Sequence, residues 1–189
     1  MKELFIKNMV CNRCIIAVRQ ELLNNSIEPI SIDLGLVRLA SDLDPALRDN
    51  LARALKASGF ELLEDAKSKL VDQIKTFVIN KIHHQVFVEM TSNWSQLISK
   101  ELDHDYKFLS SLFSSVEKTT IEQYIIRQKV ERVKELLLYD ELNLSEISYQ
   151  LGYSSVQHLS QQFKKITGST PSQYKASTEA NKRNPLDAI

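Results

Sequence analysis

The sequence contains little glycine and proline, with four of each among 189 residues. This scarcity excludes collagen-like and low-complexity architectures. The 43% of apolar residues is enough to form the core of one large domain or of two small ones. Basic and acidic residues number 24 each, so the chain lacks the cationic excess of many nucleic-acid and membrane binders. The net charge alone therefore gives no indication of partners.

Long apolar runs are absent as well. No stretch reaches the roughly 18 consecutive apolar residues that a membrane-spanning helix needs. The first seven residues alternate charged and apolar side chains, whereas a signal peptide would place a longer apolar block behind its basic start. We therefore expect a cytoplasmic protein without a membrane partner.

Cysteine occurs only twice, at Cys11 and Cys14. One pair three positions apart cannot supply a disulfide framework, and in a reducing compartment it indicates metal or thiol chemistry. We identify no Ser-His-Asp arrangement, no phosphate-binding glycine loop and no paired catalytic carboxylates. The chain is therefore not expected to be an enzyme.

The first 66 residues have the pattern β-α-β-β-α-β. Four runs with strand-like patterning and two with helical spacing follow one another at residues 2–7, 15–23, 30–34, 36–39, 44–59 and 60–63. Asp44-Pro45 is a helix start with an acidic cap, and Gly35 permits a tight reversal between two of the strands. This order predicts a ferredoxin-like sandwich, a four-stranded antiparallel sheet with both helices on one face.

The remainder of the chain has helical spacing throughout. From residue 68 to 166 apolar residues recur at helical intervals without a convincing strand pattern, so the fold class is α+β with an all-α second part. The junction near residues 66–69 contains neither Gly nor Pro and should connect the halves with little slack. We expect domains at 1–66 and 67–175 and a flexible tail at 176–189.

An internal repeat lies within the helical half, where five residues recur after 49 or 50 positions. The pairs are Ile98 with Ile147, Leu102 with Leu151, Leu109 with Leu159, Ser110 with Ser160 and Phe113 with Phe163. Two helix-turn-helix units are implied, joined by a long helix over residues 121–138. Four cations of that connecting helix are expected on its outside: Arg127, Lys129, Arg132 and Lys134.

The second copy of the repeat is the sharper one. It reads Ile147-Ser148-Tyr149-Gln150-Leu151-Gly152-Tyr153-Ser154-Ser155, followed by Leu159-Ser160, Phe163-Lys164-Lys165, Thr167-Gly168 and Thr170-Pro171-Ser172-Gln173-Tyr174. This run resembles the DNA-binding domain of AraC-type transcription regulators, and the resemblance extends over roughly residues 68–175. It implies two recognition helices that enter successive major-groove segments on one face of double-stranded promoter or operator DNA, about 34 Å apart.

The resemblance places Gln157 and Gln161 at base-facing positions of the second recognition helix, with His158 beside them. A glutamine amide can donate and accept at adenine N7 and N6 together. Four further side chains would hold phosphates, namely Ser154, Ser155, Lys164 and Lys165. Residues 144–175 contain three lysines against one glutamate, a net charge of +2, which supports contact of this segment with phosphates.

The first unit departs from the AraC-type pattern. The family's glycine in the turn is replaced around Asp103-His104-Asp105, and the base-facing positions are Lys107, Ser110 and Ser111. Residues 101–122 contain five acids against two lysines, a net charge of −3, and anionic side chains repel phosphate. We therefore expect the second unit to dominate the affinity for DNA.

The first domain resembles heavy-metal-associated domains of copper chaperones and copper-transporting ATPases. The resemblance rests on Met9-Val10-Cys11-Asn12-Arg13-Cys14 and Gly59-Phe60, while Asn8 stands where that family commonly has glycine. It implies metal capture by Cys11 and Cys14. Two thiolates from one loop suit Cu(I) or another soft ion, whereas zinc ordinarily needs four ligands and is less expected. Met9 is expected to be a core residue.

Three other side chains are expected to have no binding role. His83 and His84 are adjacent, so on a helix they point about 100° apart, and we expect both to be solvated. Trp94 opens a short helix and is expected to fill core.

Together the two halves predict a metal-responsive, DNA-binding transcription regulator. The expected partners are operator DNA and a soft metal ion, with RNA polymerase as a further candidate, and we expect a monomer or a weak homodimer. Two alternatives stay open. One is a thiol-redox protein that uses Cys11 and Cys14, and the other is a metal-chaperone adaptor whose helical half binds protein.

Overall fold

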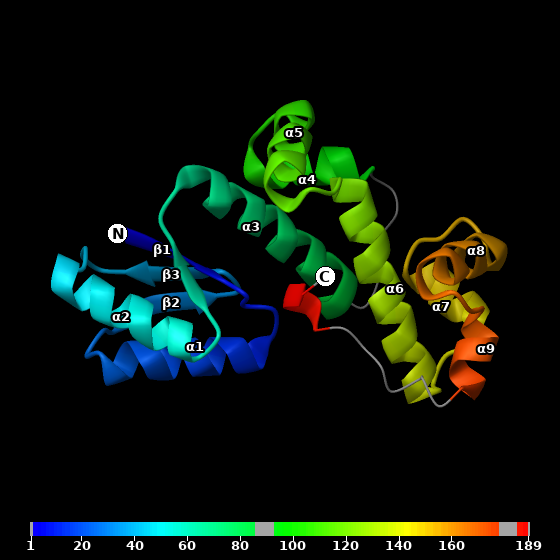
Figure 1. Cartoon of the computed structure of the whole chain (residues 1–189), viewed down its shortest axis with the longest axis horizontal. Helices are drawn as coiled ribbons and strands as arrows, with labels where there is room; N and C mark the ends of the chain where they lie inside the picture. Colours follow the sequence, from blue (N-terminus) through cyan, green and yellow to red (C-terminus); the bar gives the residue numbers. More distant parts are fainter. Residues whose placement is uncertain (1, 86–92, 178–184, 189) are drawn as a thin grey trace. The chain divides into compact units, whose positions relative to one another are not determined.

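A computed structural model describes residues 2–85, 93–177 and 185–188 of the chain (Figure 1). The chain divides into two compact units, Met1–Thr76 and Phe77–Ile189. The division falls inside one helix, α3 (Ala66–Ile79), whereas the sequence pattern places the domain boundary at residue 66. Helix α3 begins three residues after the last strand, which agrees with the short junction expected from the sequence.

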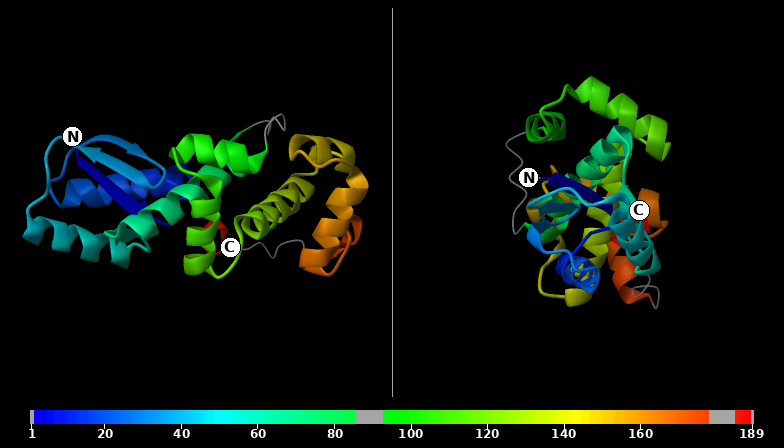
Figure 2. Two further views of the ribbon diagram at one scale, coloured as in Figure 1. Left: turned by 90° about the horizontal axis from the view of Figure 1, so that it is seen from above. Right: turned by 90° about the vertical axis from the view of Figure 1, so that its left-hand side faces the viewer.

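The first unit contains a four-stranded sheet and two helices before α3. The elements are β1 (Lys2–Lys7), α1 (Asn12–Asn24), β2 (Pro29–Asp33), β3 (Leu36–Leu39), α2 (Pro45–Ala57) and β4 (Glu61–Leu63). The strand order is β2-β3-β1-β4 with every neighbouring pair antiparallel. Figures 1 and 2 show α1 and α2 along the same face of this sheet. The predicted β-α-β-β-α-β order and pairing are thus observed.

Alternation in the strands explains how this unit forms its core. In β1, Leu4 and Ile6 are buried while Lys2 and Glu3 are exposed. The buried strand residues pack with residues of both helices in one apolar cluster, which includes Val18, Leu22, Leu51 and Leu55. Asp44 caps α2 by accepting a hydrogen bond from the Leu47 N–H at 2.9 Å, as expected.

The second unit is helical over its described residues, and no strand occurs among them. After α3 come η1 (Asn80–His84), α4 (Trp94–Leu102), α5 (Tyr106–Glu117), α6 (Ile121–Tyr139), α7 (Leu144–Gln150), α8 (Val156–Thr167), α9 (Pro171–Ala176) and η3 (Leu186–Ala188). None of the helices in the described part of the chain is long and apolar enough to cross a membrane. The predicted flexible tail lies largely outside the described residues.

Helix α6 is the central element of the second unit (Figure 1). It packs against η1, α5, α8 and α9. Eleven of its nineteen residues are buried: Ile121, Tyr124, Ile125, Gln128, Lys129, Val130, Glu131, Val133, Lys134, Leu136 and Leu137. A helix with one apolar stripe would leave its opposite face in solvent, but α6 is covered on several sides.

The expectation that four cations lie outside α6 is wrong for two of them. Arg127 is exposed, but Lys129 and Lys134 are only 6% and 7% exposed. The Lys134 Nζ lies 2.6 Å from the Glu131 Oε1, which pairs this buried charge. Arg132 is half-buried and donates to Glu135 at 2.6 Å. Helices packed on several sides of α6 cover positions that periodicity assigned to solvent, and the aliphatic lysine stems tolerate this burial.

The expectation of two solvated histidines is wrong for His83. This side chain is buried, and its Nε2 lies 2.9 Å from the Gln128 Oε1 of α6, whereas His84 is exposed. The Gln128 amide nitrogen donates in turn to the Tyr124 hydroxyl and to the Leu186 carbonyl, at 3.0 and 3.2 Å. A partner 45 residues away supplies the polar contact that burial of an imidazole requires.

The burial of Lys129 leads to a prediction about pH. Burial lowers its pKa from 10.5 to about 8. Below pH 8 the amine is charged in both folded and unfolded states, so the full cost of burying the charge is present. Above pH 8 the folded state releases the proton while the unfolded state still holds it, so stability rises towards pH 10.5. Lys129→Met should remove this rise.

We expect wild type to gain about 1–2 kcal/mol of unfolding free energy relative to Lys129→Met between pH 7 and pH 9.5. Urea denaturation of both proteins in phosphate-free buffers measures this difference. Parallel pH profiles would contradict the assignment of a buried, uncompensated ammonium group.

Candidate nucleic-acid interface

The second helix-turn-helix unit, α7 and α8, has a complete set of local signals. Asn143 and Glu146 form a reciprocal capping box at the start of α7, with hydrogen bonds of 2.7 to 3.0 Å. Gly152 follows the end of α7 with φ +62°, in the left-handed region that favours glycine. Ser155 then caps α8 by accepting from the His158 N–H at 3.1 Å. The turn is therefore built as the sequence predicts.

Helix α8 has one buried and one exposed face. Leu159 and Phe163 are fully buried, so they fix the orientation of the helix. Side chains expected to contact DNA lie in solvent, namely Ser154, Gln157, His158, Gln161, Lys164 and Lys165, while Ser155 is half-buried. Because positions four apart share a helix face, Gln157 and Gln161 lie on the same face. The structure thus brings together amides and ammonium groups on one edge.

The His158 side chain is held at the start of this face. Its Nδ1 lies 3.0 Å from the Ser154 hydroxyl, and its ring meets the Tyr153 ring edge-on at a centroid distance of 5.6 Å. An imidazole held from two sides presents a fixed surface and loses little further freedom on binding.

The first unit, α4 and α5, achieves the same turn without glycine. Asp103 has φ +51° and accordingly adopts the left-handed conformation in place of the expected glycine. Aspartate tolerates this region better than most residues. Asp105 caps α5 by accepting from the backbone N–H groups of Lys107 and Phe108, at 2.9 and 3.2 Å. The acids that depart from the AraC-type pattern therefore have structural functions in the turn.

The exposed face of α5 includes a residue that the sequence analysis did not identify. Lys107 and Ser111 are exposed and Ser110 is half-buried. Phe108 is 53% exposed between them, with its ring 5.7 Å from that of His104. Its position corresponds to His158 at the repeat offset of 50, which is the signal that could have identified it. An exposed aromatic ring can contact a thymine methyl group.

The two cysteines lie at the start of α1 in the first unit. Cys11 is the N-cap residue and Cys14 is in the first turn, with the two Sγ atoms 3.5 Å apart and both thiols free. Met9 is buried, as expected. Asn8, at the family's glycine position, has φ +72°, and its side chain donates to the Gly59 carbonyl at 3.0 Å. Among the described residues no group of three or more Cys, His, Asp or Glu side chains could hold a metal ion.

The two thiols differ in acidity. Partial burial raises the pKa of Cys11, but hydrogen bonds from Cys14 and Arg13 outweigh this effect and lower the pKa overall. Burial raises the pKa of Cys14, and the neighbouring Cys11 raises it further. Cys11 is thus the thiol that ionises first.

Comparison with known proteins supports the helix-turn-helix assignment. The family model described as a helix-turn-helix domain matches residues 98–177. This supports the AraC-type helix-turn-helix domain that the sequence predicts, and it leaves residues 1–97 outside the match. The C-terminal domain of AraT, a response regulator from Geobacillus stearothermophilus, aligns with a TM-score of 0.50 at 23% identity, covering 59% of this chain and 88% of that domain. That likeness concerns the fold.

Two curated relatives are regulators by name. The Msm operon regulatory protein of Streptococcus mutans is 27% identical over 69% of this chain and 46% of its own length. The HTH-type transcriptional activator RhaR of Salmonella schwarzengrund is 24% identical over 72% of this chain and 47% of its own length. The chain spans about half the length of these relatives. Neither is named as an enzyme, which agrees with the expectation for this chain.

The two turns yield a matched pair of stability predictions. Gly152→Ala should lower the unfolding free energy by about 1 kcal/mol, because the left-handed conformation that glycine adopts freely is strained for alanine. Asp103→Gly should leave stability unchanged or raise it by up to about 1 kcal/mol, because it relieves the same strain in the first turn. Thermal and urea denaturation measure both changes. Equal destabilisation by the two substitutions would contradict the left-handed assignment of Asp103.

Proposed function

We propose that this chain is a sequence-specific, DNA-binding transcription regulator that uses α8 and α5 as recognition helices. The observation that supports it most strongly is the exposed face of α8, where Gln157 and Gln161 share one side and Lys164 follows a turn later. Glutamine amides can read adenine, and ammonium groups can neutralise backbone phosphates.

The packing of α6 supports binding by a single copy of the chain. Its nineteen residues extend about 28 Å at 1.5 Å per residue. Helices α5 and α8 both pack against it. Two recognition helices that pack against one helix of this length suit major-groove segments that lie about 34 Å apart on one face of DNA. The proposal therefore needs no second protomer to address two half-sites.

The proposal predicts an unequal contribution of the two units. On a duplex selected from a random library, Gln161→Ala should cost about 1–3 kcal/mol and relax specificity at one base pair. Lys107→Ala should cost less, because Asp103, Asp105 and Glu101 surround the first unit with negative charge. Fluorescence anisotropy at fixed salt measures both affinities, and a larger loss for Lys107→Ala would contradict this ranking.

A phosphate contact has a different signature. Lys164→Ala should weaken all duplexes alike and reduce the slope of log affinity against log salt by about one. Arg127→Ala, an exposed cation of α6, is the matched control and should leave the slope unchanged if α8 alone supplies this contact. If no duplex is enriched from the library, the proposed function is wrong.

We further propose that the first unit is a ferredoxin-like domain of the heavy-metal-associated kind, in which Cys11 and Cys14 capture Cu(I) or a similar soft ion. The donor set fits such an ion, because two sulfur atoms 3.5 Å apart at a helix N-terminus can contact one ion together. The lowered pKa of Cys11 favours the thiolate that binds metal. Zinc would need further ligands from outside the pair.

A regulatory role requires the ion to favour one state of the chain over another. Two observations support a route for such coupling. The boundary between the units falls inside α3, so no loop separates them. The π-helix η1 follows α3 directly, and its buried His83 is hydrogen-bonded to Gln128 of α6. A change at the end of α3 would thereby reach the helix that carries both recognition units.

The metal proposal is tested by titrating the reduced protein with Cu(I) against a competing chelator. Wild type should bind one equivalent, Cys11→Ser and Cys14→Ser should lose this binding, and Met9→Leu should retain it because Met9 fills core. Cu(I) should change the affinity of wild type for its selected duplex at least fivefold, the usual lower range of allosteric coupling. It should not change that of Cys11→Ser.

Two results would overturn the regulatory claim. Identical duplex affinity with and without bound Cu(I) would remove the coupling while leaving metal capture in place. Rapid dithiol exchange with a model disulfide, without Cu(I) binding, would instead favour the thiol-redox function, which the short Sγ to Sγ distance also permits.

A further inference from the structure

A cavity of about 520 Å³ lies within the second unit, between the two helix-turn-helix units. It is lined by residues from the start of α4, the start of α5, the first half of α6, and the turn and first half of α8. Its volume is in the range of small-ligand sites. The side chains that carry chemistry there are Trp94, Tyr106, Glu122, Lys129, Tyr153 and His158.

Lys129 is the lysine of this cavity, and no acidic side chain among the described residues forms an ion pair with it. It is 6% exposed, and its Nζ lies 5.0 Å from the centroid of the Tyr153 ring. Within residues 2–85, 93–177 and 185–188 it has no hydrogen bond or ion pair. Lys134 is buried to the same degree on the same helix, yet it is paired with Glu131 at 2.6 Å. Burial on α6 therefore does not by itself leave a lysine unpaired.

Two further donors of the cavity are also without partners in the described part of the chain. The Tyr153 hydroxyl and the Trp94 Nε1 are buried and make no hydrogen bond. An indole N–H can only donate, and a buried donor left unsatisfied costs about 1–3 kcal/mol. Three donors line one cavity, and none of the described residues supplies a matching acceptor for them.

The acidic group of the cavity lies away from Lys129. Glu122 is seven residues earlier on α6, which is about 10 Å along the helix axis. Its Oε1 accepts a hydrogen bond of 2.5 Å from the Tyr106 hydroxyl, so this carboxylate is already engaged. The cavity thus has an anionic end at Glu122 and a cationic end at Lys129, where an incoming anion would be directed.

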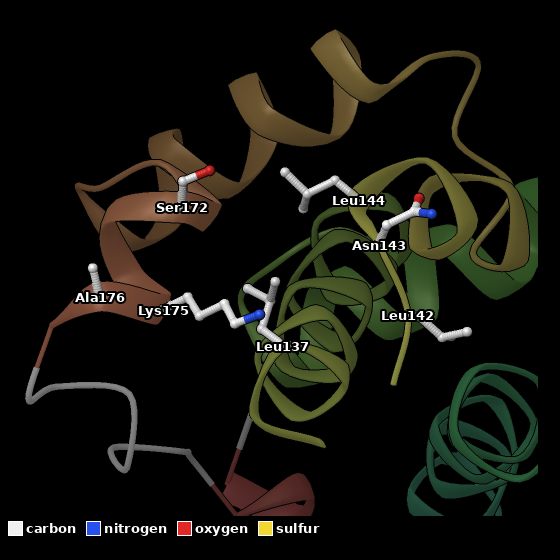
Figure 3. Close-up of a pocket in the computed structure, with 7 residues that line it drawn as sticks. All are labelled: Leu137, Leu142, Asn143, Leu144, Ser172, Lys175 and Ala176. Atoms are coloured by element: carbon white, nitrogen blue, oxygen red, sulfur yellow. The ribbon is translucent and has the colours of Figure 1, made fainter. Parts of the chain in front are cut away.

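Another cavity of the second unit has a lysine that is paired, in contrast to Lys129. It measures about 480 Å³ and lies between the end of α6, the start of α7 and α9 (Figure 3). Its cation, Lys175, is paired with Asp140, and its Asn143 caps α7. The remaining lining is mostly leucine. Of these two cavities, the one at Lys129 combines a buried, unpaired cation with unsatisfied donors among the described residues.

We propose that the cavity between the two helix-turn-helix units binds a phosphate group through Lys129, Tyr153 and Trp94. A phosphate monoester offers three terminal oxygen acceptors and a phosphodiester offers two, and either compensates the buried ammonium charge. Its source is either a small phosphorylated molecule or a backbone phosphate of bound DNA. Phosphate binding at this site does not depend on the proposed function. Only the alternative in which the phosphate comes from DNA rests on the proposed function.

Trp94 is the sole tryptophan of the sequence, so its fluorescence and its indole N–H resonance report on this cavity alone. Inorganic phosphate, titrated at constant ionic strength against chloride, should change both signals saturably in the millimolar range. Lys129→Gln should weaken this binding at least tenfold. Tyr153→Phe, which removes only the hydroxyl and keeps the ring, should weaken it several-fold. Arg127→Gln, exposed on the same helix, should have no effect.

A second titration with the selected duplex identifies the source. If inorganic phosphate leaves Trp94 unchanged, but the duplex shifts its signals and Lys129→Gln lowers the salt slope by about one, the phosphate belongs to DNA. Silence of Trp94 in both titrations overturns the site, and so does an unchanged phosphate response in Lys129→Gln and Tyr153→Phe. Failure to bind any duplex would count against the proposed function. The phosphate titration would still decide whether the cavity binds phosphate.

Discussion

The packing of α6 against both helix-turn-helix units is the constraint on which the rest of the second unit depends. The elements η1, α5, α8 and α9 all pack against this helix, so α6 connects the exposed faces of α5 and α8. The same packing leaves α6 little surface for solvent, so polar residues at Gln128, Lys129 and Lys134 become interior. One helix thus supports both faces of the candidate interface and contributes the buried polar residues beneath them.

Local signals allowed most of the fold to be predicted from the sequence. Alternation identified the strands, Asp44 and Gly152 identified a helix start and a turn, and the repeat identified the two units. The interior of α6 could not be predicted in this way, because periodicity assigns one buried stripe per helix. His83 and Lys129 are buried by elements distant in the chain, and such contacts leave no mark on the local pattern.

The candidate interface was predictable where the sequence follows the AraC-type pattern that it resembles and less so where it departs from that pattern. At α8 every expected contact residue lies at the surface except the half-buried cap, Ser155. Asn8 and Asp103 replace glycines of the two resembled families, and both adopt the left-handed backbone that glycine would have taken. The departures therefore preserve the turns. Phe108 was missed because an apolar residue in a helix is first assigned to core, although its counterpart His158 is exposed.

The unpaired charge of Lys129 connects stability with binding. A group that binds the folded chain but not the unfolded chain stabilises it in proportion to the logarithm of its concentration over its dissociation constant. A phosphate at Lys129 would both satisfy three donors and offset the cost of burying the ammonium. The folded chain would then be least stable when the cavity is empty. Ligand binding would strengthen the contacts of α4, α6 and α8 around the cavity. Because α4 belongs to one helix-turn-helix unit, α8 to the other and α6 joins them, an occupied cavity would add contacts that link the two units.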